Sequence, residues 1–490
     1  MLAFAVPASA NTATRPAPQT TRRAKPHTSA AALLARRRLT REIKRIWAGP
    51  YLRRGKTAVY IVDARSGEEL YAVHQDEGMN PASNTKLVAT AAALDVLGPR
   101  WRYRTSVYGP TPNGQGVVAG DVYLHGDFDG SLSPKNMESL ADSIANRGIR
   151  RVEGDVLVGK GVRDGIAWPW VYIDIHGGDS PKEPPQVTVY PDSDFVHVNV
   201  TAHTSWYRRA WAHAKQPVVK TDADGRPYVE VTIAGAIRVH RRQRFKRWVP
   251  MRSVYTASVL RAALLARGVV VTGHVRRAAF KQYVSRSVLR REFLPVELAS
   301  HLSKPLAKLI CKINKTSDNI LADMMTRTVG RKVFGTPRLK RGAEVLERWL
   351  DEHADVNRSP VVITTGSGLS YKTRISARQL VQTLRVAGGY DGDRSRELTA
   401  MYRDSLAIAG KDGTLRRRFH HTPVRGKLHG KTGTLSSVIA LSGYLQGPDD
   451  RVLAFSILTN HTKRWLRWGV RRKHEKIVQA MERYLTAIAH

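Results

Sequence analysis

Residues 80–87 read NPASNTKL, and the fold of the chain can be worked out from this segment. A proline in the first turn followed by apolar residues at helical spacing is typical of a helix, and Gly98 with the proline after it marks the end. Ser83 and Lys86 are three residues apart, so they share one face of this helix. They also lie near its N-terminus, where unpaired backbone N–H groups and the positive end of the helix dipole are found. The stretch therefore predicts a serine beside a lysine at a helix start.

Two more short strings lie further along the chain, Ser-Asp-Asn at residues 317–319 and Lys-Thr-Gly at residues 431–433. Both strings, like the S-x-x-K pattern of residues 83–86, occur once in the chain. At average composition each of the two arises by chance on the order of a few hundredths to a tenth of a time in a chain of this length. Taken singly, each residue of the three strings is most simply explained as an ordinary helix, surface or strand residue without a catalytic role. Together, in this order, the strings predict one active site.

The predicted catalytic residues are Ser83, Lys86 and Ser317. A serine hydroxyl is a poor nucleophile until a neighbouring base takes its proton. Lys86 can act as that base if it is neutral, and burial together with nearby positive charge would lower its pKa to that end. Ser317 would then pass the proton to the leaving amine.

Five further residues are predicted to bind the substrate. The amide of Asn319 can hold a peptide backbone. Lys431 and Thr432, followed by Gly433, form a cationic, hydroxyl-bearing strand edge that suits a substrate carboxylate. The helix start at the serine and the backbone N–H of Thr434 would bind an oxyanion. We expect neither a metal nor a cofactor at this site.

Charge favours anionic partners. The 490 residues include 80 lysines and arginines against 41 aspartates and glutamates, a formal net charge of +39. An anionic cell-wall polymer or an acidic membrane surface would suit this balance, and a general preference for arginine explains it equally well. The basic clusters match no nucleic-acid-binding module, so nucleic acid is not an expected partner. No run of 18 apolar residues is present, as a membrane-spanning helix would need.

The N-terminus and the cysteine content favour export. Residues 1–10 are apolar and end in Ala-Ser-Ala, like the second half of a secretory signal peptide. A disordered linker is predicted to follow, so that residues 1–37 precede the folded part. Cys311 is the only cysteine, which excludes an intrachain disulfide and a cysteine-based metal site, and its apolar neighbours predict a buried thiol. We expect a periplasmic or secreted protein.

Periodicity predicts two hairpins and a set of helices. The hairpins comprise residues 57–63 with 69–73 and residues 435–445 with 452–459, and Lys-Thr-Gly is expected to open the second hairpin. The predicted helices after the first one are 298–325, which carries Ser-Asp-Asn, then 339–353, 376–387 and 471–488.

The region between the first helix and the second string has a different texture. Residues 106–290 alternate short β-like runs with glycine, proline and aspartate turns, which predicts one or two inserted β-rich accessory domains. The catalytic domain would then comprise residues 38–105 and 291–490. The expected fold class is α/β (α+β), an antiparallel sheet flanked by helices and interrupted by the insert.

Longer segments resemble the D-alanyl-D-alanine carboxypeptidase/endopeptidase family, the low-molecular-mass class C penicillin-binding proteins. The resemblance covers roughly residues 55–105 and 295–460 and rests on NPASNTKL at 80–87, AAALDVLG at 91–98, LASH at 298–301, NKTSDNI at 314–320, GSGLS at 366–370 and AGKDGTL at 409–415. It implies a transpeptidase/β-lactamase-like catalytic domain with inserted accessory domains. It also implies a serine peptidase that removes a terminal D-alanine from peptidoglycan stem peptides, or cleaves their cross-links, through an acyl-enzyme that β-lactams trap.

The chain departs from the pattern of this family at two places. Thr365 stands where the family usually has an aspartate before GSGLS. Gly159 and Lys160 stand where it typically has an acidic residue that helps to hold the amine of the diamino acid. The catalytic centre is therefore expected to be intact, while the stem peptide that it accepts stays open, as does the preference for carboxypeptidase or endopeptidase activity.

Two other functions are compatible with the same strings. A β-lactamase or esterase on this scaffold would need fast deacylation, to which no residue can be assigned. A non-catalytic cell-wall-binding protein would need only the insert and the positive charge. The intact strings favour catalysis.

Overall fold

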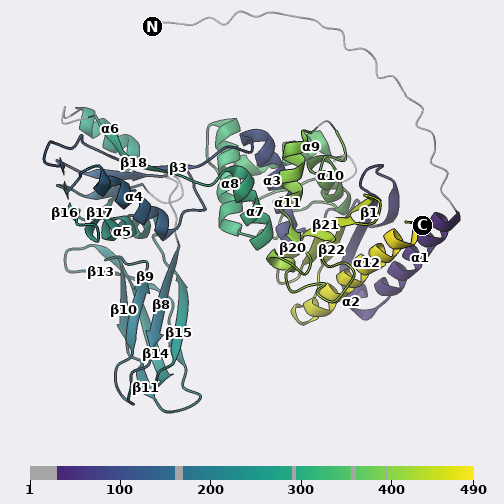
Figure 1. The fold of residues 1–490 in the computed structure, drawn as a ribbon, viewed down its shortest axis with the longest axis horizontal. Helices are drawn as coiled ribbons and strands as arrows, with labels where there is room; N and C mark the ends of the chain where they lie inside the picture. Colours follow the sequence, from purple (N-terminus) through teal and green to yellow (C-terminus); the bar gives the residue numbers. More distant parts are fainter. Residues whose placement is uncertain (1–29, 160–168, 290–293, 355–359, 393, 490) are drawn as a thin grey trace, which may run out of the picture.

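The computed structural model describes residues 30–159, 169–289, 294–354, 360–392 and 394–489. They form a main lobe (the described part of residues 30–103 and 303–489) and an inserted lobe (the described part of residues 104–302), which lie side by side in Figure 1. The predicted mixed α/β fold with an antiparallel sheet flanked by helices is confirmed. None of the helices in the described ranges has the length and apolar character that a membrane span requires.

The main lobe is built on one antiparallel sheet with the strand order β19-β20-β21-β22-β1-β2. These strands are β1 (Lys56–Asp63), β2 (Glu69–Val73), β19 (Ala407–Ile408), β20 (Leu428–Thr434), β21 (Ile439–Gln446) and β22 (Val452–Asn460). The first hairpin pairs as predicted, and β1 lies along the whole of β22. Every residue of β22 is buried because helices cover both faces of the sheet.

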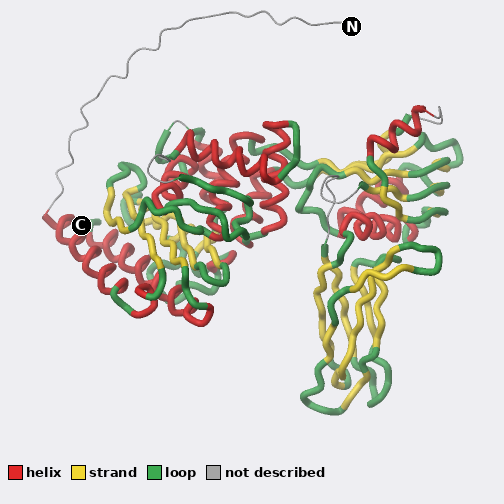
Figure 2. The backbone as a smooth tube through the Cα atoms, turned by 180° about the vertical axis from the view of Figure 1, so that it is seen from behind, coloured by secondary structure: helices red, strands yellow, loops and turns green. Residues whose placement is uncertain are grey.

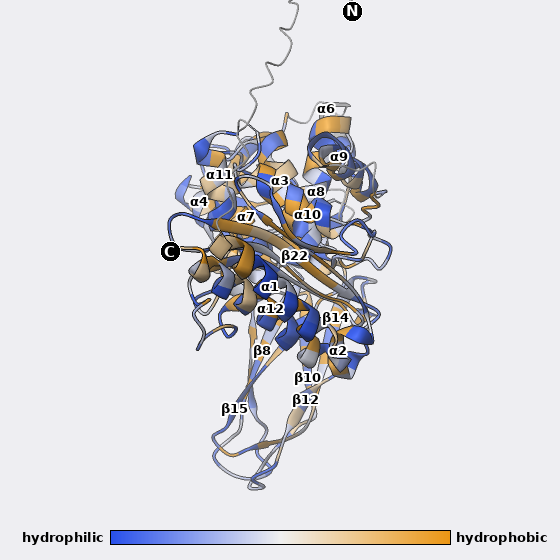
Figure 3. Ribbon diagram, turned by 90° about the vertical axis from the view of Figure 1, so that its right-hand side faces the viewer, coloured by the Kyte–Doolittle hydropathy of each residue, from blue (hydrophilic) through white to orange (hydrophobic). Residues whose placement is uncertain are grey.

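Two helical layers cover this sheet. The helix α1 (Ala30–Trp47) packs beside α12 (Arg467–Ala487) over one face, as Figure 3 shows, and the short α2 (Pro50–Arg53) lies with them. The other face carries α3 (Thr85–Leu97), α7 (Leu306–Thr316), α8 (Asn319–Phe334), α9 (Leu339–His353), α10 (Ala377–Ala387) and α11 (Arg396–Asp404). Each layer shares a separate apolar core with the sheet.

The predicted disordered linker is wrong from Ala30 onward. Leu39 and Ile43 on α1 are buried in the core that α12 and the sheet also line, and this packing adds to the helix propensity of its alanines, leucines and arginines. The predicted signal segment at residues 1–10 lies outside the described residues.

Two other predicted elements are wrong at their boundaries. The predicted helix 298–325 begins as the strand β18 (Val296–Leu302) and is then broken at Ser317, whose left-handed backbone (φ 59°) ends α7, while Asp318 caps α8 by accepting the Leu321 N–H. Lys-Thr-Gly does not open the second hairpin. It lies near the end of β20, a strand of its own, and a turn after Thr434 leads into β21.

Cys311 is not the core thiol that its neighbours predict. It lies half-exposed on α7 and lines a surface cavity, and burial of this part of the helix raises the pKa of its thiol.

The inserted lobe has an upper part of sheet and helices. Its strands are β3 (Arg104–Gly109), β4 (Val117–Val118), β5 (Val122–His125), β6 (Arg151–Val152), β7 (Val156–Val158), β16 (Val270–Val271) and β17 (Val275–Arg277), with β18 at one edge. Its helices are α4 (Pro134–Asn146), α5 (Arg252–Leu265) and α6 (Phe280–Leu289). The helix α4 was not predicted, because its capping box pairs Ser133 with Asn136 in place of the usual Glu or Gln.

From this upper part extends a narrow β arm, residues 170–248, seen from two sides in Figures 1 and 2. Its strands are β8 (Trp170–His176), β9 (Gln186–Tyr190), β10 (Val196–Val200), β11 (His203–Ser205), β12 (Ala212–Ala214), β13 (Val218–Thr221), β14 (Pro227–Arg238) and β15 (Arg242–Trp248). The arm consists of the β15-β8-β9 sheet facing a second sheet centred on β14.

The two lobes are joined through β3 and β18, which pair antiparallel with each other. β3 straddles the predicted domain boundary at 106, whereas β18 begins after the predicted boundary at 290. Arg104 and Glu297 at this junction form a two-point ion pair. The predicted division of the chain into domains stays a prediction.

Replacing Phe455 by alanine is expected to destabilise the main lobe. The ring is fully buried in the centre of β22, so its loss leaves a cavity in close-packed core and lowers the free energy of unfolding by about 3–5 kcal/mol. Guanidinium unfolding followed by circular dichroism would measure this. Val219→Ala, at an exposed strand position, serves as the control and should change stability by about 0.5 kcal/mol or less. Equal midpoints for the two variants would contradict this packing.

Candidate active site

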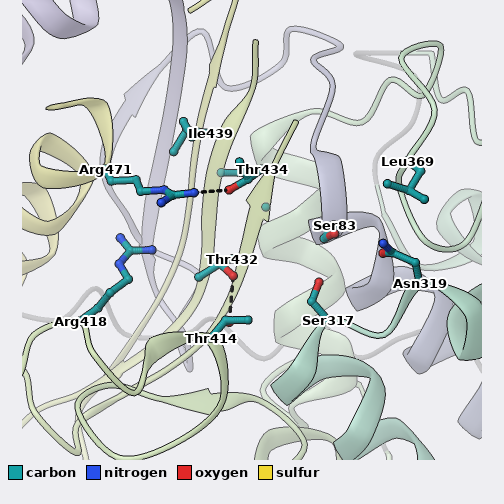
Figure 4. Close-up of a pocket in the computed structure, with 12 residues that line it drawn as sticks. Ser83, Ser317, Asn319, Leu369, Thr414, Arg418, Thr432, Thr434, Ile439 and Arg471 are labelled. Atoms are coloured by element: carbon teal, nitrogen blue, oxygen red, sulfur yellow. Dashed lines mark hydrogen bonds between the residues drawn. The ribbon is translucent and has the colours of Figure 1, made fainter. Parts of the chain in front are cut away.

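The three strings meet at one cavity of about 380 Å³ between the helical layer and the sheet. Figure 4 shows Ser83, Ser317 and Asn319 on one side of the cavity and Thr432 and Thr434 of β20 facing them. The cavity is lined by Ser83, Ser317, Asn319, Leu369, Thr414, Arg418, Thr432, Gly433, Thr434, Ile439, Ala440 and Arg471. Of the eight residues predicted for the site, Lys86 and Lys431 lie behind this lining.

Ser83 lies in a single 3₁₀ turn, Ala82–Asn84, directly before α3, and not in the α-helix itself as the sequence predicts. Side-chain amides tie this turn to the sheet. Asn80 N–H donates to Asn460 Oδ1 (2.8 Å), Asn460 Nδ2 donates back to the Asn80 carbonyl (2.9 Å), and Asn84 Nδ2 donates to Ser442 Oγ (2.6 Å). The serine hydroxyl is therefore held by buried bonds on both sides.

Two glycines allow the chain to pass close to this turn. A Cβ on Gly433 would lie 2.7 Å from the Pro81 carbonyl oxygen, and one on Gly368 would lie 1.9 Å from that of Ala82. Gly368 also has a positive φ of 75°, which other residues adopt at a cost. Only glycine at these two positions lets β20 and the GSGLS loop pack against the serine turn.

The side chain of Lys86 is fully buried behind Ser83. Its Nζ lies 3.0 Å from Ser83 Oγ, 2.7 Å from Asn319 Oδ1 and 2.5 Å from the Ser367 carbonyl oxygen. The last two atoms only accept hydrogen bonds, so a neutral amine satisfies both with its two hydrogens. Its lone pair is then left for the hydroxyl proton of Ser83. The geometry is that of a serine and its general base.

Burial lowers the pKa of Lys86 to about 8, against the opposing effect of Asp323 and Asp318, whose negative charges favour the protonated amine. Asp323 of α8 is a site residue that the sequence analysis missed. Burial raises the pKa of Asp323 as well, and its carboxylate accepts the Ser367 N–H at 2.8 Å. It thereby holds the loop whose carbonyl contacts the lysine.

A second buried lysine lies beside the second serine. Lys431 Nζ is 2.9 Å from Ser317 Oγ and 2.9 Å from the Thr432 carbonyl oxygen. Burial first, and the charge of Lys86 second, hold the pKa of Lys431 well below its usual value. Lys431 is thus buried and does not form the exposed cationic strand edge that the sequence analysis expected. The two lysines disfavour each other's protonation.

Positive charge enters the cavity from Arg418 and Arg471 instead, which Figure 4 shows beside the threonines of β20. Arg471 Nη2 donates to Thr434 Oγ1 (3.1 Å), and Arg418 pairs with Glu475 (2.6 Å). Burial and then the neighbouring guanidinium groups, Arg418 first and Arg467 second, lower the pKa of Arg471. Such crowding of like charge favours a bound anion. The sequence showed these arginines only as parts of basic clusters.

The departures from the family pattern have different outcomes. The hydroxyl of Thr365 accepts a hydrogen bond from the Gly368 N–H at 3.1 Å. Thr365 therefore supports the GSGLS loop through its side-chain oxygen. Gly159 follows β7 and is buried, while Lys160 lies outside the described residues.

Among the described residues no group of three or more metal-ligating side chains is present.

A serine paired with a buried lysine, and a second serine paired with a second lysine, at the edge of an antiparallel sheet define a serine enzyme that works through an acyl intermediate. The comparisons with known proteins agree. The family model described as D-Ala-D-Ala carboxypeptidase 3 (S13) family matches residues 39–480, and the chain belongs to this family of serine peptidases.

Individual relatives cover most of the chain. It is 29% identical over 455 residues to a D-alanyl-D-alanine carboxypeptidase of Actinomadura sp. (strain R39), which covers 86% of this chain and 81% of that protein. It is 28% identical over 414 residues to a carboxypeptidase of Mycobacterium tuberculosis, covering 83% and 76%. Penicillin binding protein 4 of Haemophilus influenzae, solved in complex with a β-lactam, superposes with a TM-score of 0.68 at 19% identity, covering 91% and 99%.

The rate of acylation by a β-lactam is expected to rise with pH. Lys86 must be neutral to accept the serine proton, and its pKa is about 8, so the second-order rate constant should rise about tenfold per unit below pH 8 and level off above it. Stopped-flow measurement with a chromogenic β-lactam from pH 6 to 10 gives the profile, with circular dichroism at each pH as the control for folding. A rate that is flat or falls over this range would contradict Lys86 as the base.

Proposed function

We propose that this protein is a serine-type D-Ala-D-Ala carboxypeptidase/endopeptidase that acts on peptidoglycan stem peptides, with Ser83 as the nucleophile. Membership of the S13 family and the carboxypeptidase names of its relatives support this activity. The observation that carries the assignment of the nucleophile is the 3.0 Å contact between Ser83 Oγ and the buried Lys86 Nζ. Both removal of a terminal D-alanine and cleavage of a cross-link would use this same centre.

Acylation begins when neutral Lys86 accepts the proton of Ser83. The serine oxygen then attacks the carbonyl carbon of the penultimate D-alanine, and the negative charge that forms on the carbonyl oxygen is stabilised by the backbone N–H groups of Ser83 and Thr434. The C–N bond breaks as the leaving amine takes a proton from Ser317. Ser317 regains a proton, through Lys431, from the protonated Lys86, so the proton first taken from Ser83 ends on the leaving amine and Lys86 is neutral again. The ester on Ser83 remains until hydrolysis.

Deacylation uses the same groups in the reverse sense. A water molecule gives a proton to the amine that accepted one in acylation, and its oxygen attacks the ester carbon. The C–O bond to Ser83 breaks, the serine oxygen regains a proton, and the shortened peptide leaves as a carboxylic acid. A β-lactam would acylate Ser83 in the same way and deacylate slowly, which fits the β-lactam complex of the Haemophilus influenzae relative.

The substrate carboxylate is assigned to Arg471, with Arg418 beside it and Thr432 and Thr434 at the strand edge. The carboxylate of a terminal D-alanine lies two bonds from the leaving nitrogen, so it must point away from Ser83 along β20, toward these groups. A guanidinium group and hydroxyls suit a carboxylate. Asn319 would hold the peptide backbone with its free amide hydrogens.

The substrate implies a position outside the cytoplasmic membrane, where peptidoglycan lies, so we propose an extracytoplasmic enzyme. A β-lactamase or esterase remains the second enzymatic candidate on this scaffold, and rapid turnover of a chromogenic cephalosporin would favour it. The catalytic pairing of Ser83 with Lys86 disfavours a purely adhesive protein.

Labelling with a fluorescent penicillin tests the proposed nucleophile. The wild-type protein should retain the label through denaturing electrophoresis, and Ser83→Ala should retain none because no ester can form. Ser66→Ala, which changes a serine in the first β-turn, is the matched control and should label like the wild type. A folded wild-type protein without label, or a labelled Ser83→Ala variant, would refute the assignment.

Substitution of Arg471 tests the carboxylate site. Arg471→Gln should lower kcat/KM for a diacyl-D-Ala-D-Ala peptide by about 10–100-fold, because a hydrogen bond to a charged group contributes roughly 1.5–3 kcal/mol. Arg471→Lys should recover part of the loss. The same peptide with an amidated C-terminus is the control substrate and should be hydrolysed at nearly equal rates by wild type and variant. Equal losses for both substrates would show that Arg471 does not bind the carboxylate.

A further inference from the structure

Three loops close the free end of the β arm and form one surface, the arm tip, which we define as residues 177–183, 205–211 and 238–242. Backbone hydrogen bonds join them, since Gly177 N–H donates to the Arg241 carbonyl (3.0 Å) and Val239 N–H donates to that of Ser205 (3.1 Å). Figures 1 and 2 show this end of the arm, next to β11, pointing away from the upper part of the inserted lobe.

The arm tip exposes large aromatic rings. Trp206 is 66% exposed, Tyr207 81% and Trp211 60%. Side chains of this kind usually bury a large apolar area, so their exposure is unusual. Single exposed apolar residues are common on protein surfaces, but three aromatic rings within six residues at one end of a lobe are a cluster. Tryptophan and tyrosine have an apolar body and a polar edge, a combination that suits the boundary between lipid and water.

The same surface is strongly basic. Its cationic side chains outnumber its carboxylates by six to two: Lys182, Arg208, Arg209, Arg238, Arg241 and Arg242 against Asp179 and Glu183. Within the described part of the chain none of these six cations forms an ion pair. Of the two carboxylates, Glu183 accepts the N–H groups of its own loop, and Asp179 is exposed with His240 3.4 Å away. The charge available to a partner is therefore positive.

Cations and rings are interleaved at the arm tip. A hollow of about 500 Å³ is bordered by Lys182, Trp206, Tyr207 and Arg208, and the guanidinium of Arg241 lies 5.4 Å from the ring centre of Trp211. If the phosphate of a phospholipid is held between Lys182 and Arg208, the acyl chains of that lipid lie beside the aromatic rings. The chemistry of this surface matches the headgroup region of an anionic phospholipid bilayer.

We propose that the arm tip docks the protein on a membrane surface that carries anionic phospholipid. The rings enter the headgroup region, and the arginines and the lysine bind lipid phosphates. The arm then spaces the main lobe, with the cavity of Ser83, away from the bilayer. A glycan site would instead need carboxylates or amides to bind sugar hydroxyls, and the arm tip has no asparagine or glutamine and only two carboxylates against six cations.

Co-sedimentation of the full chain with sucrose-loaded vesicles tests this docking. The wild type should bind vesicles that contain 30% phosphatidylglycerol in phosphatidylcholine, and bind pure phosphatidylcholine at least tenfold more weakly. Replacing Trp206, Tyr207 and Trp211 together by alanine should lower the partition coefficient at least tenfold, and so should replacing Arg208, Arg209 and Arg241 by glutamine. Brominated lipids should quench tryptophan emission in the wild type and less in the aromatic variant.

Matched variants distinguish binding through the arm tip from nonspecific hydrophobic or electrostatic binding by the rest of the surface. Trp465→Ala with Trp468→Ala removes rings of similar exposure, 68% and 65%, from the main lobe, and Arg37→Gln, Arg41→Gln and Arg45→Gln remove three exposed cations from α1. Both should bind vesicles like the wild type. Uptake of fluorescent penicillin by every variant reports that the main lobe is folded. Vesicle binding that the tip variants leave unchanged, or that the control variants lose equally, would overturn the proposal, as would tip-dependent binding to isolated glycan strands without binding to vesicles.

Discussion

Two lysine amines are buried in one site, and the arrangement of the surrounding fold follows from their burial. Lys86 and Lys431 are both fully buried, and a charged amine out of water is costly. The fold meets this cost by lowering the pKa of both amines and by placing acceptors around them, Asn319 and Ser367 on one lysine and Ser317 on the other. A neutral lysine beside a serine is what acyl transfer requires. The features that secure the burial are therefore also those that make the serine reactive.

Close packing around these amines explains the surrounding architecture. The serine turn is tied to the sheet through Asn80 and Asn84, and glycines at 368 and 433 let two other segments approach it. The break between α7 and α8 at Ser317 brings the second hydroxyl to Lys431. Helices on both faces of the sheet keep water away from the lysines. Strands β1 and β22, from opposite ends of the chain, form the centre of this scaffold.

The sequence predicted those parts in which local chemistry is distinctive. Three strings indicated which residues meet, and the two hairpins and the long amphipathic helices were visible from periodicity. It could not predict that Lys431 is buried, because burial depends on the serine turn and on Ser317, which distant parts of the chain place against β20. Asp323, Arg418 and Arg471 were missed because nothing in their local sequence distinguishes them from other surface charges. The helix α4 was missed because its cap uses an unusual residue, and α1 because tertiary packing stabilises it.

Peptide mapping of the penicillin adduct by tandem mass spectrometry tests whether the buried amine of Lys86 makes Ser83 the nucleophile. After brief exposure to benzylpenicillin and digestion, we expect one acylated residue, Ser83, at near-stoichiometric yield in the wild type. In Lys86→Met, which keeps the side-chain volume but removes the base, that adduct should form at least a thousandfold more slowly. An adduct on Ser317, or rapid acylation of Ser83 in the Lys86→Met protein, would contradict the account.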